Sequence, residues 1–136
     1  MSARSKARKR ALDVLFECEV RGLRLGETLD ERVLAGEPPV NEYTVRLIHG
    51  VTEHQARIDE LVTAYARGWS LDRMPTVDRN ALRIGVFELL YVDEVPDAVA
   101  ITEAMNLVRD LSTDDSPAFV NGVLGSVLRD KPALPA

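Results

Sequence analysis

The chain has 136 residues, of which 46% are apolar, and it carries 17 basic and 22 acidic side chains. This length suits one compact domain that buries roughly two-thirds of its unfolded surface without needing a cofactor or a disulfide in order to fold. No stretch approaches the ~18 consecutive apolar residues of a membrane span, and the basic start runs into Asp13 and Glu17 instead of the apolar core of a signal peptide. We therefore expect a soluble, cytoplasmic protein.

Apolar residues recur along the chain at three- and four-residue steps, the spacing of one face of a helix. Breaks in this pattern fall at glycine and proline, for example at Gly36 to Pro39 and at Gly68. Pro96 and the pair Ser116-Pro117 are typical of helix starts. The predicted helices span about 7–21, 27–35, 44–65, 77–92, 97–111 and 116–127.

The sequence therefore predicts an all-α protein, folded as a compact helical bundle. No long run alternates with the period of a strand, and no Asn-Gly or Asp-Gly turn joins two β-rich runs. The segment 77–92 has little polar face, so we expect it to be central and buried. Cys18 falls at an apolar position and is expected to be a small buried thiol. The tail 131–136 contains two prolines and is expected to fray.

The start of the chain, RSKARKR, concentrates positive charge at Arg4, Lys6, Arg8, Lys9 and Arg10. Outside this basic tip, residues 11–136 hold only 12 basic side chains against 22 acidic ones. The free N–H groups of a first helical turn already carry partial positive charge, so helix stability does not explain cations there. Placed at 100° steps, Lys6, Lys9 and Arg10 point away from the apolar face and toward solvent or a partner.

Three explanations of the basic tip are open. It could be a solvated, disordered end, a membrane-surface contact or a nucleic-acid contact. The apolar face beside the cluster is mostly alanine, which offers little to bury in lipid. Phosphates suit the cluster better, because neutralising them releases counterions and arginine can bind them with two hydrogen bonds. We therefore favour nucleic acid.

A second unusual passage is DDSPAFVNGVL, over 114–124. Phe119 falls in the first turn of its predicted helix, beside free N–H groups that can bind an anion. Its ring could simply pack in the core. Alternatively, it could stack on an unpaired base, as aromatic side chains do in single-stranded RNA recognition.

The residue types that carry enzymatic chemistry do not form a known pattern here. His49, Glu53 and His54 fail the spacing of a zinc protease, which needs Glu next to the first His and a second His four residues on. The pair Asp114-Asp115 is more typical of a loop and helix cap than of a metal site. No P-loop or Rossmann glycine pattern is present. We expect no enzyme activity, no cofactor and no metal.

Four passages together resemble the NusB family of bacterial transcription antitermination factors. They are the basic tip, VDRNALRIGVFELL (77–90), VPDAVAITEAMNLV (95–108) and DDSPAFVNGVL. The resemblance covers nearly the whole chain, and FVNGVL is its most specific part. It implies one domain over 1–136, built as an all-α bundle of six to seven helices in two small subdomains.

The resemblance also implies a function. Members of this family bind the boxA element of ribosomal RNA transcripts together with NusE, a small-subunit ribosomal protein, and act in the RNA polymerase antitermination complex. Some members form homodimers that cover the RNA surface, so the state of self-association stays open. A protein-binding helical adaptor without RNA binding is the alternative.

The family's functional positions can be carried over to this chain. Asp78 matches an acidic position at the NusE contact. The RNA-binding positions are matched by Arg4, Lys6, Arg8, Lys9, Arg10, Asp115 and Phe119.

Overall fold

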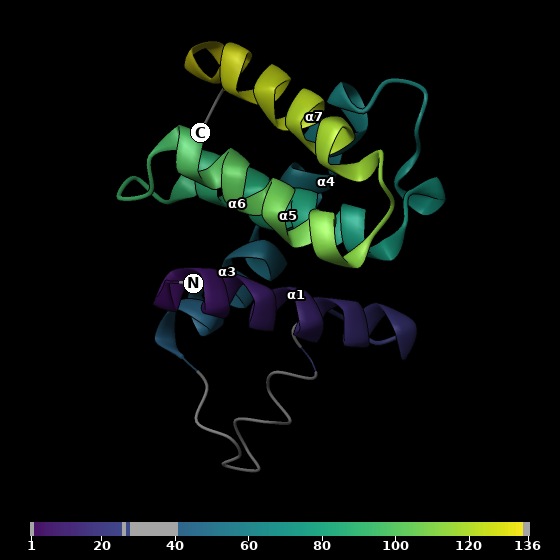
Figure 1. The fold of residues 1–136 in the computed structure, drawn as a ribbon, viewed down its shortest axis with the longest axis vertical. Coiled ribbons are helices and arrows are strands. Elements are labelled where there is room, and N and C mark those ends of the chain that lie inside the picture. Colours follow the sequence, from purple (N-terminus) through teal and green to yellow (C-terminus); the bar gives the residue numbers. More distant parts are fainter. Residues whose placement is uncertain (1, 26, 28–40, 135–136) are drawn as a thin grey trace.

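The computed structural model describes residues 2–25, 27 and 41–134, which contain helices and turns and no strand (Figure 1). The predicted all-α class is confirmed. The helix predicted over 27–35 lies outside the described residues, apart from Glu27. The elements are α1 (Ala3–Val20), α3 (Glu42–Glu53), α4 (Gln55–Tyr65), η1 (Leu71–Arg73), α5 (Thr76–Tyr91), α6 (Asp97–Leu111), α7 (Ser116–Asp130) and η2 (Lys131–Ala133).

Helix α5 is the centre of the bundle, as its composition predicted. It packs against α1 and α3 on one side and against α4, α6 and α7 on the other (Figure 1). Every residue from 80 to 89 is buried. The remaining helices bury one apolar face each and expose a polar one, which is the pattern expected of helices around a central one.

The long helix predicted over 44–65 is two helices. Helix α3 ends at Glu53 and α4 begins at Gln55, with a turn at His54. The His54 ring stacks on Tyr91 of α5, with 4.0 Å between ring centroids and 12° between planes. The apolar spacing continues across a break of one residue, so periodicity alone does not reveal it.

In its described part, 131–134, the tail differs from the expectation of a frayed end over 131–136. Lys131–Ala133 forms the short turn η2, and Leu134 packs partly buried against the core. The Lys131 ammonium lies 2.9 Å from the Asp97 carboxylate at the start of α6. This ion pair and the contact of Leu134 tie the chain to the bundle up to residue 134.

Gly50 lets α3 approach the ring of Phe87 on α5. A Cβ atom added at Gly50 would lie 2.1 to 2.7 Å from three atoms of that ring, which is closer than real carbon atoms come. The Phe87 ring therefore packs directly on the backbone of α3.

We expect Gly50→Ala to lower the free energy of unfolding by about 1–3 kcal/mol, because the overpacking outweighs the gain in helix propensity. Gly125→Ala on α7 is the matched control, since nothing lies within 4 Å of its added Cβ. It should raise stability by roughly 0.4–1 kcal/mol. Urea unfolding followed by circular dichroism measures both. A stabilising Gly50→Ala would show that the Phe87 ring moves aside freely.

Candidate RNA interface and its support

The basic tip is part of α1, which begins earlier than the predicted residue 7. Ser2 caps the helix, and its side-chain oxygen accepts the Ser5 N–H at 3.0 Å. Lys6 and Arg10 are exposed and make no ion pair with other described residues. Lys9 is paired with Asp13, one turn further on, at 2.7 Å. The tip is therefore a fixed helical surface along which cations are presented.

Arg8 departs from the expectation that the five cations act together. It is 2% exposed, and its Nε donates to both oxygens of Glu88 on α5, at 2.9 and 3.0 Å. Its guanidinium also lies 3.4 Å from the Glu103 carboxylate of α6. Because Glu88 lies in the buried face of the central helix, it needs a buried counter-charge, and Arg8 supplies it. As placed, Arg8 is not available to a phosphate.

The Arg8 pair is part of a larger buried cluster. Burial alone would lower the pKa of Arg8, but the hydrogen bond and charge of Glu88 outweigh burial and raise it. The Tyr43 hydroxyl of α3 also donates to Glu88, and burial together with that carboxylate raises the pKa of Tyr43. Exposed Arg4 lies over the Tyr43 ring, 4.6 Å from its centroid. The start of α1 is thus held to three other helices.

The burial of Arg8 could have been predicted from its position in the helical repeat, although not from the run of basic residues around it. Arg8 is followed at helical spacing by Leu12 and Leu15, both buried, so it belongs to the apolar stripe of α1. Glu88 interrupts an otherwise apolar run of α5 in the same way. Because Arg8 and Glu88 have opposite charges and each lies on the apolar face of its helix, their positions predict a buried ion pair.

Phe119 lies at a cavity of about 460 Å³ between η1, the start of α5 and the start of α7. We call this cavity the aromatic pocket. Phe119 is half-buried and meets Trp69 edge to face, with 6.4 Å between centroids and 66° between planes. Trp69, from the segment before η1, is 52% exposed. The remaining residues that line the pocket are Arg73, Met74, Pro75, Asp78, Thr113, Asp115 and Ser116.

Asp78, the predicted NusE contact, lies in the lining of the aromatic pocket and is only 3% exposed. The Ser116 hydroxyl donates to its Oδ2 at 2.8 Å and so ties the start of α5 to the start of α7. Its Oδ1 is buried and has no hydrogen-bond partner among the described residues. Asp115, the predicted RNA contact, is exposed at the edge of the same pocket.

A second hollow, a groove, lies beside the basic tip. It has a volume of about 380 Å³ and runs between the start of α1 and the second half of α6. Its lining includes Ser5 and Lys9 of α1 and, from α6, the cation Arg109 and the carboxylates Glu103 and Asp110. Asp110 and Leu111 line the groove, and Thr113 and Asp115, a few residues later, line the aromatic pocket.

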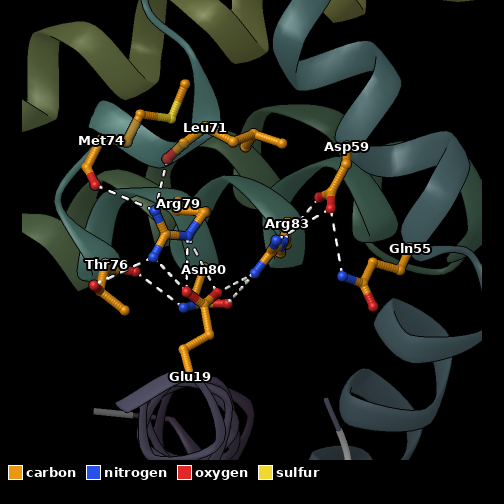
Figure 2. A network of polar contacts seen from close by, with 9 residues as sticks. All are labelled: Glu19, Gln55, Asp59, Leu71, Met74, Thr76, Arg79, Asn80 and Arg83. Carbon is orange, nitrogen blue, oxygen red and sulfur yellow. Dashed lines mark hydrogen bonds and ion pairs between the residues drawn. The ribbon is translucent and has the colours of Figure 1, made fainter. Parts of the chain in front are cut away.

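A polar network joins α1, α4 and α5 to the segment that contains Leu71 and Met74 (Figure 2). Arg79 of α5 donates to Glu19 of α1 and to the carbonyl oxygens of Leu71 and Met74, at 2.6 and 3.3 Å. These carbonyls belong to η1 and the residue after it, so Arg79 fixes the segment that forms one pocket wall. Arg83 joins the same Glu19 to Asp59 of α4, the latter at 2.8 Å.

We expect Glu19→Gln to lower the free energy of unfolding by about 1–3 kcal/mol near pH 7, because it weakens hydrogen bonds to two arginines. Burial alone would raise the pKa of Glu19, but the hydrogen bond from Arg79 and the charges of Arg83 and Arg79 lower it. Its contribution is therefore complete above its ordinary value of 4.5 and is lost as pH falls through the lowered value.

The variant should consequently lose less stability than the wild type on going from about pH 6 to about pH 3. Urea unfolding at the two pH values measures the difference. Equal losses in the two proteins would mean that Glu19 titrates as it does in the unfolded chain.

Across 2–25, 27 and 41–134, the His, Cys, Asp and Glu side chains form no group of three or more that could hold a metal ion. No described helix combines the length and apolar character that a membrane span requires.

Comparison with known proteins places this architecture in one family. The model of the NusB family matches residues 5–129. A transcription antitermination protein NusB from Nocardioides sp. strain JS614 is 66% identical over 134 residues, covering 98% of this chain and 99% of the relative.

Solved structures agree. NusB of T. maritima is 33% identical with a TM-score of 0.83, over 95% of this chain and 92% of that one. A crystal structure of antitermination factors NusB and NusE in complex with dsRNA contains a chain that is 30% identical, with a TM-score of 0.78, over 93% of this chain and 96% of that one. The all-α bundle, the match over most of the chain and these relatives show that the chain belongs to the NusB family.

Proposed function

We propose that this protein is a transcription antitermination factor that binds boxA-type RNA together with NusE. The observation that carries the RNA part of the proposal is the surface of α1, which holds exposed cations in a fixed helix, together with the half-buried Phe119 ring at the aromatic pocket. A relative of known structure is found with NusE and dsRNA, which supports the same partners here.

The exposed cations and Phe119 would contribute differently to RNA binding. Arg4, Lys6, Lys9 and Arg10 would supply salt-dependent affinity for phosphates, which carries no information on sequence. Phe119 would stack on a base, and Asp115 lies close enough to the same pocket to contact the RNA. The fifth predicted cation, Arg8, would hold the helix in place instead of touching RNA.

The predicted contact between Asp78 and NusE requires that NusE reach a buried side chain. Because this side chain is buried, a partner protein could reach it only by inserting a side chain into the aromatic pocket. We propose that bound NusE and RNA place the protein in the RNA polymerase antitermination complex. We assign it no catalytic step.

The test is fluorescence-anisotropy binding of a boxA-like RNA and a scrambled control, each with and without NusE, across a salt series. We expect tighter binding of boxA, increased by NusE. Analytical ultracentrifugation of the same samples tells a homodimer that covers the surface from a monomer. If monomeric protein binds neither RNA at low salt, the function as an adaptor without RNA binding replaces this proposal.

A further inference from the structure

We propose that Ser116 is a positioning residue whose hydrogen bond to Asp78 couples two binding surfaces of the protein. One surface is the start of α5, where the contact with NusE is predicted at Asp78. The other is the start of α7, where Asp115 and Phe119 are predicted RNA contacts. The inference rests on the proposed function and adds to it a buried residue through which the binding of one partner raises the affinity for the other.

The Ser116 hydroxyl points to a neighbouring helix. A serine that caps a helix usually accepts an N–H of that same helix. Ser116 is instead 1% exposed, and its hydroxyl donates to Oδ2 of Asp78 at 2.8 Å, a bond that we call the Asp78–Ser116 link. The same oxygen accepts the Thr113 N–H at 3.3 Å and lies 3.1 Å from the Ser112 hydroxyl. One buried oxygen therefore joins the start of α7, the segment before it and the start of α5.

The Asp78–Ser116 link is the one side-chain hydrogen bond between α5 and α7, both of which the structure describes in full. Further along, the two helices meet through close apolar packing. A Cβ atom added at Gly85 of α5 would lie 2.6 Å from the Cδ1 atom of Leu124 on α7. This packing holds the body of α7 against α5, and the link is the polar contact that sets where the first turn of α7 lies.

Stability alone does not account for the link. Asp78 is 3% exposed, and its Oδ1 has no hydrogen-bond partner among the described residues. Burying a carboxylate with one oxygen unpaired costs free energy. The free N–H groups in the first turn of α5 offset part of this cost, because they favour a negative charge there. A buried polar pair that adds little stability can instead specify how two elements are placed.

The link lies between the two predicted contact surfaces. Ser116 directly follows the exposed Asp115, whose carbonyl oxygen accepts the Phe119 N–H at 3.1 Å, so these residues are held together at the start of α7. On the other side, Asp78 lies in the first turn of α5, three residues after the exposed Pro75. A protein that contacts the start of α5 and an RNA that contacts the start of α7 are therefore joined through one hydrogen bond.

The link carries a restraint from one surface to the other. When NusE holds the start of α5, it also holds the first turn of α7 through Asp78 and Ser116. RNA then needs to order fewer groups around Phe119, which reduces the entropy cost of its binding. By linkage, bound RNA raises the affinity for NusE by the same factor. We call this factor the enhancement, which is the Kd for boxA-like RNA without NusE divided by the Kd with NusE.

The first test is the enhancement in Ser116→Ala, measured by fluorescence anisotropy on the full-length protein with saturating NusE. It should be closer to 1 than in the wild type, smaller by about 2-fold to 30-fold, the range over which single substitutions change a coupling. Ser126→Ala is the matched control, because the Ser126 hydroxyl donates within α7, to the Gly122 carbonyl at 3.0 Å. It should keep the full enhancement. Thermal unfolding checks that each variant is folded.

A second pair of variants tests whether Ser116 acts through Asp78. Asp78→Ala removes the acceptor of the link and should by itself lower the enhancement. Adding Ser116→Ala to this variant should lower it no further, because two residues that act through one interaction have non-additive effects. A second loss of similar size in the double variant would overturn the assignment of the link.

Hydrogen exchange tells the link from a merely structural role of Ser116. NusE alone, without RNA, should slow the exchange of the backbone amides of 119–121 in the wild type and in Ser126→Ala. In Ser116→Ala, these amides should exchange equally fast with and without NusE. Protection that persists in Ser116→Ala would show that NusE covers the start of α7 directly, and it would overturn the inference.

The outcomes separate this inference from the proposed function. If NusE raises the affinity for boxA-like RNA equally in the wild type and in Ser116→Ala, the coupling is wrong and the proposed function stands. If the wild type binds NusE but no RNA, the proposed function fails, whereas protection of 119–121 that depends on Ser116 still supports the link. If the wild type binds neither partner, both fail.

Discussion

Glu88→Gln should lower the free energy of unfolding by about 3–5 kcal/mol, the cost of leaving one member of a buried ion pair without its partner. Glu88 is the carboxylate that Arg8 and Tyr43 share inside the bundle. The substitution keeps the volume but removes the charge, so the Arg8 guanidinium would remain buried with only the more distant, partly exposed Glu103 carboxylate beside it. Urea unfolding followed by circular dichroism measures the loss.

Glu94→Gln is the matched control. Glu94 makes the same type of contact with Arg46, at 2.6 Å, but both side chains are largely exposed. An exposed pair of this kind contributes about 0–1 kcal/mol, so the control should change little. Similar small effects of the two substitutions would mean that water or a shift of Arg8 compensates the loss inside the bundle.

The double substitution Arg8→Met with Glu88→Leu separates charge from packing. Replacing both members of a buried pair by apolar residues of similar size is often neutral or stabilising. We therefore expect the double variant to regain much of the stability lost in Glu88→Gln. The pair then specifies where the start of α1 sits more than it stabilises the fold, and this start carries the proposed phosphate contacts.

Much of the helical architecture could be predicted from local signals. The apolar run of 77–92 predicted the buried central helix, and Pro96 and Ser116-Pro117 marked the starts of α6 and α7 within about a residue, because proline fits the first turn of a helix. The turn at His54 could not be predicted. The His54 ring stacks on Tyr91, which is a tertiary contact, while the apolar spacing on both sides is uninterrupted.

In the candidate site, too, some residues could be predicted from local sequence, and others depend on tertiary contacts. Phe119 and the exposed cations stand out in the sequence because their residue types are unusual at helix starts. Trp69 does not, because its place beside Phe119 depends on a tertiary contact between the segment before η1 and α7, 50 residues later. The sequence predicts the same role for Arg8 as for the basic residues beside it, because they are neighbours along the chain. Its actual partner, Glu88, lies 80 residues away.

Replacing Arg4, Lys6 and Arg10 together by alanine should weaken binding of boxA-like RNA by about 100-fold near 0.1 M salt and reduce the dependence of log K on log salt by about 2. Each contact between a cation and a phosphate of single-stranded RNA contributes roughly 0.7 to that slope. These three residues are exposed, whereas Lys9 is paired with Asp13 and Arg8 with Glu88. Anisotropy titrations at several salt concentrations measure both quantities.

Two comparisons make this result specific. The triple variant of Arg57, Arg67 and Arg129 to alanine loses the same positive charge from α4, the turn after it and α7, so it should keep most of the slope if the tip touches phosphate directly. Phe119→Ala should instead reduce the preference for boxA over the scrambled RNA with little change of slope, because stacking releases no counterions.

Equal slopes in the wild type and the tip variant would contradict direct phosphate contact. The charge of the whole chain makes this test more specific. Because its net charge is −5, general attraction to RNA is weak, and affinity depends on where the few exposed cations are held. The buried pair of Arg8 and Glu88 fixes that place. Glu88→Gln should therefore weaken RNA binding although it removes no exposed charge. If the basic tip were a flexible tail, the same substitution would leave RNA binding unchanged.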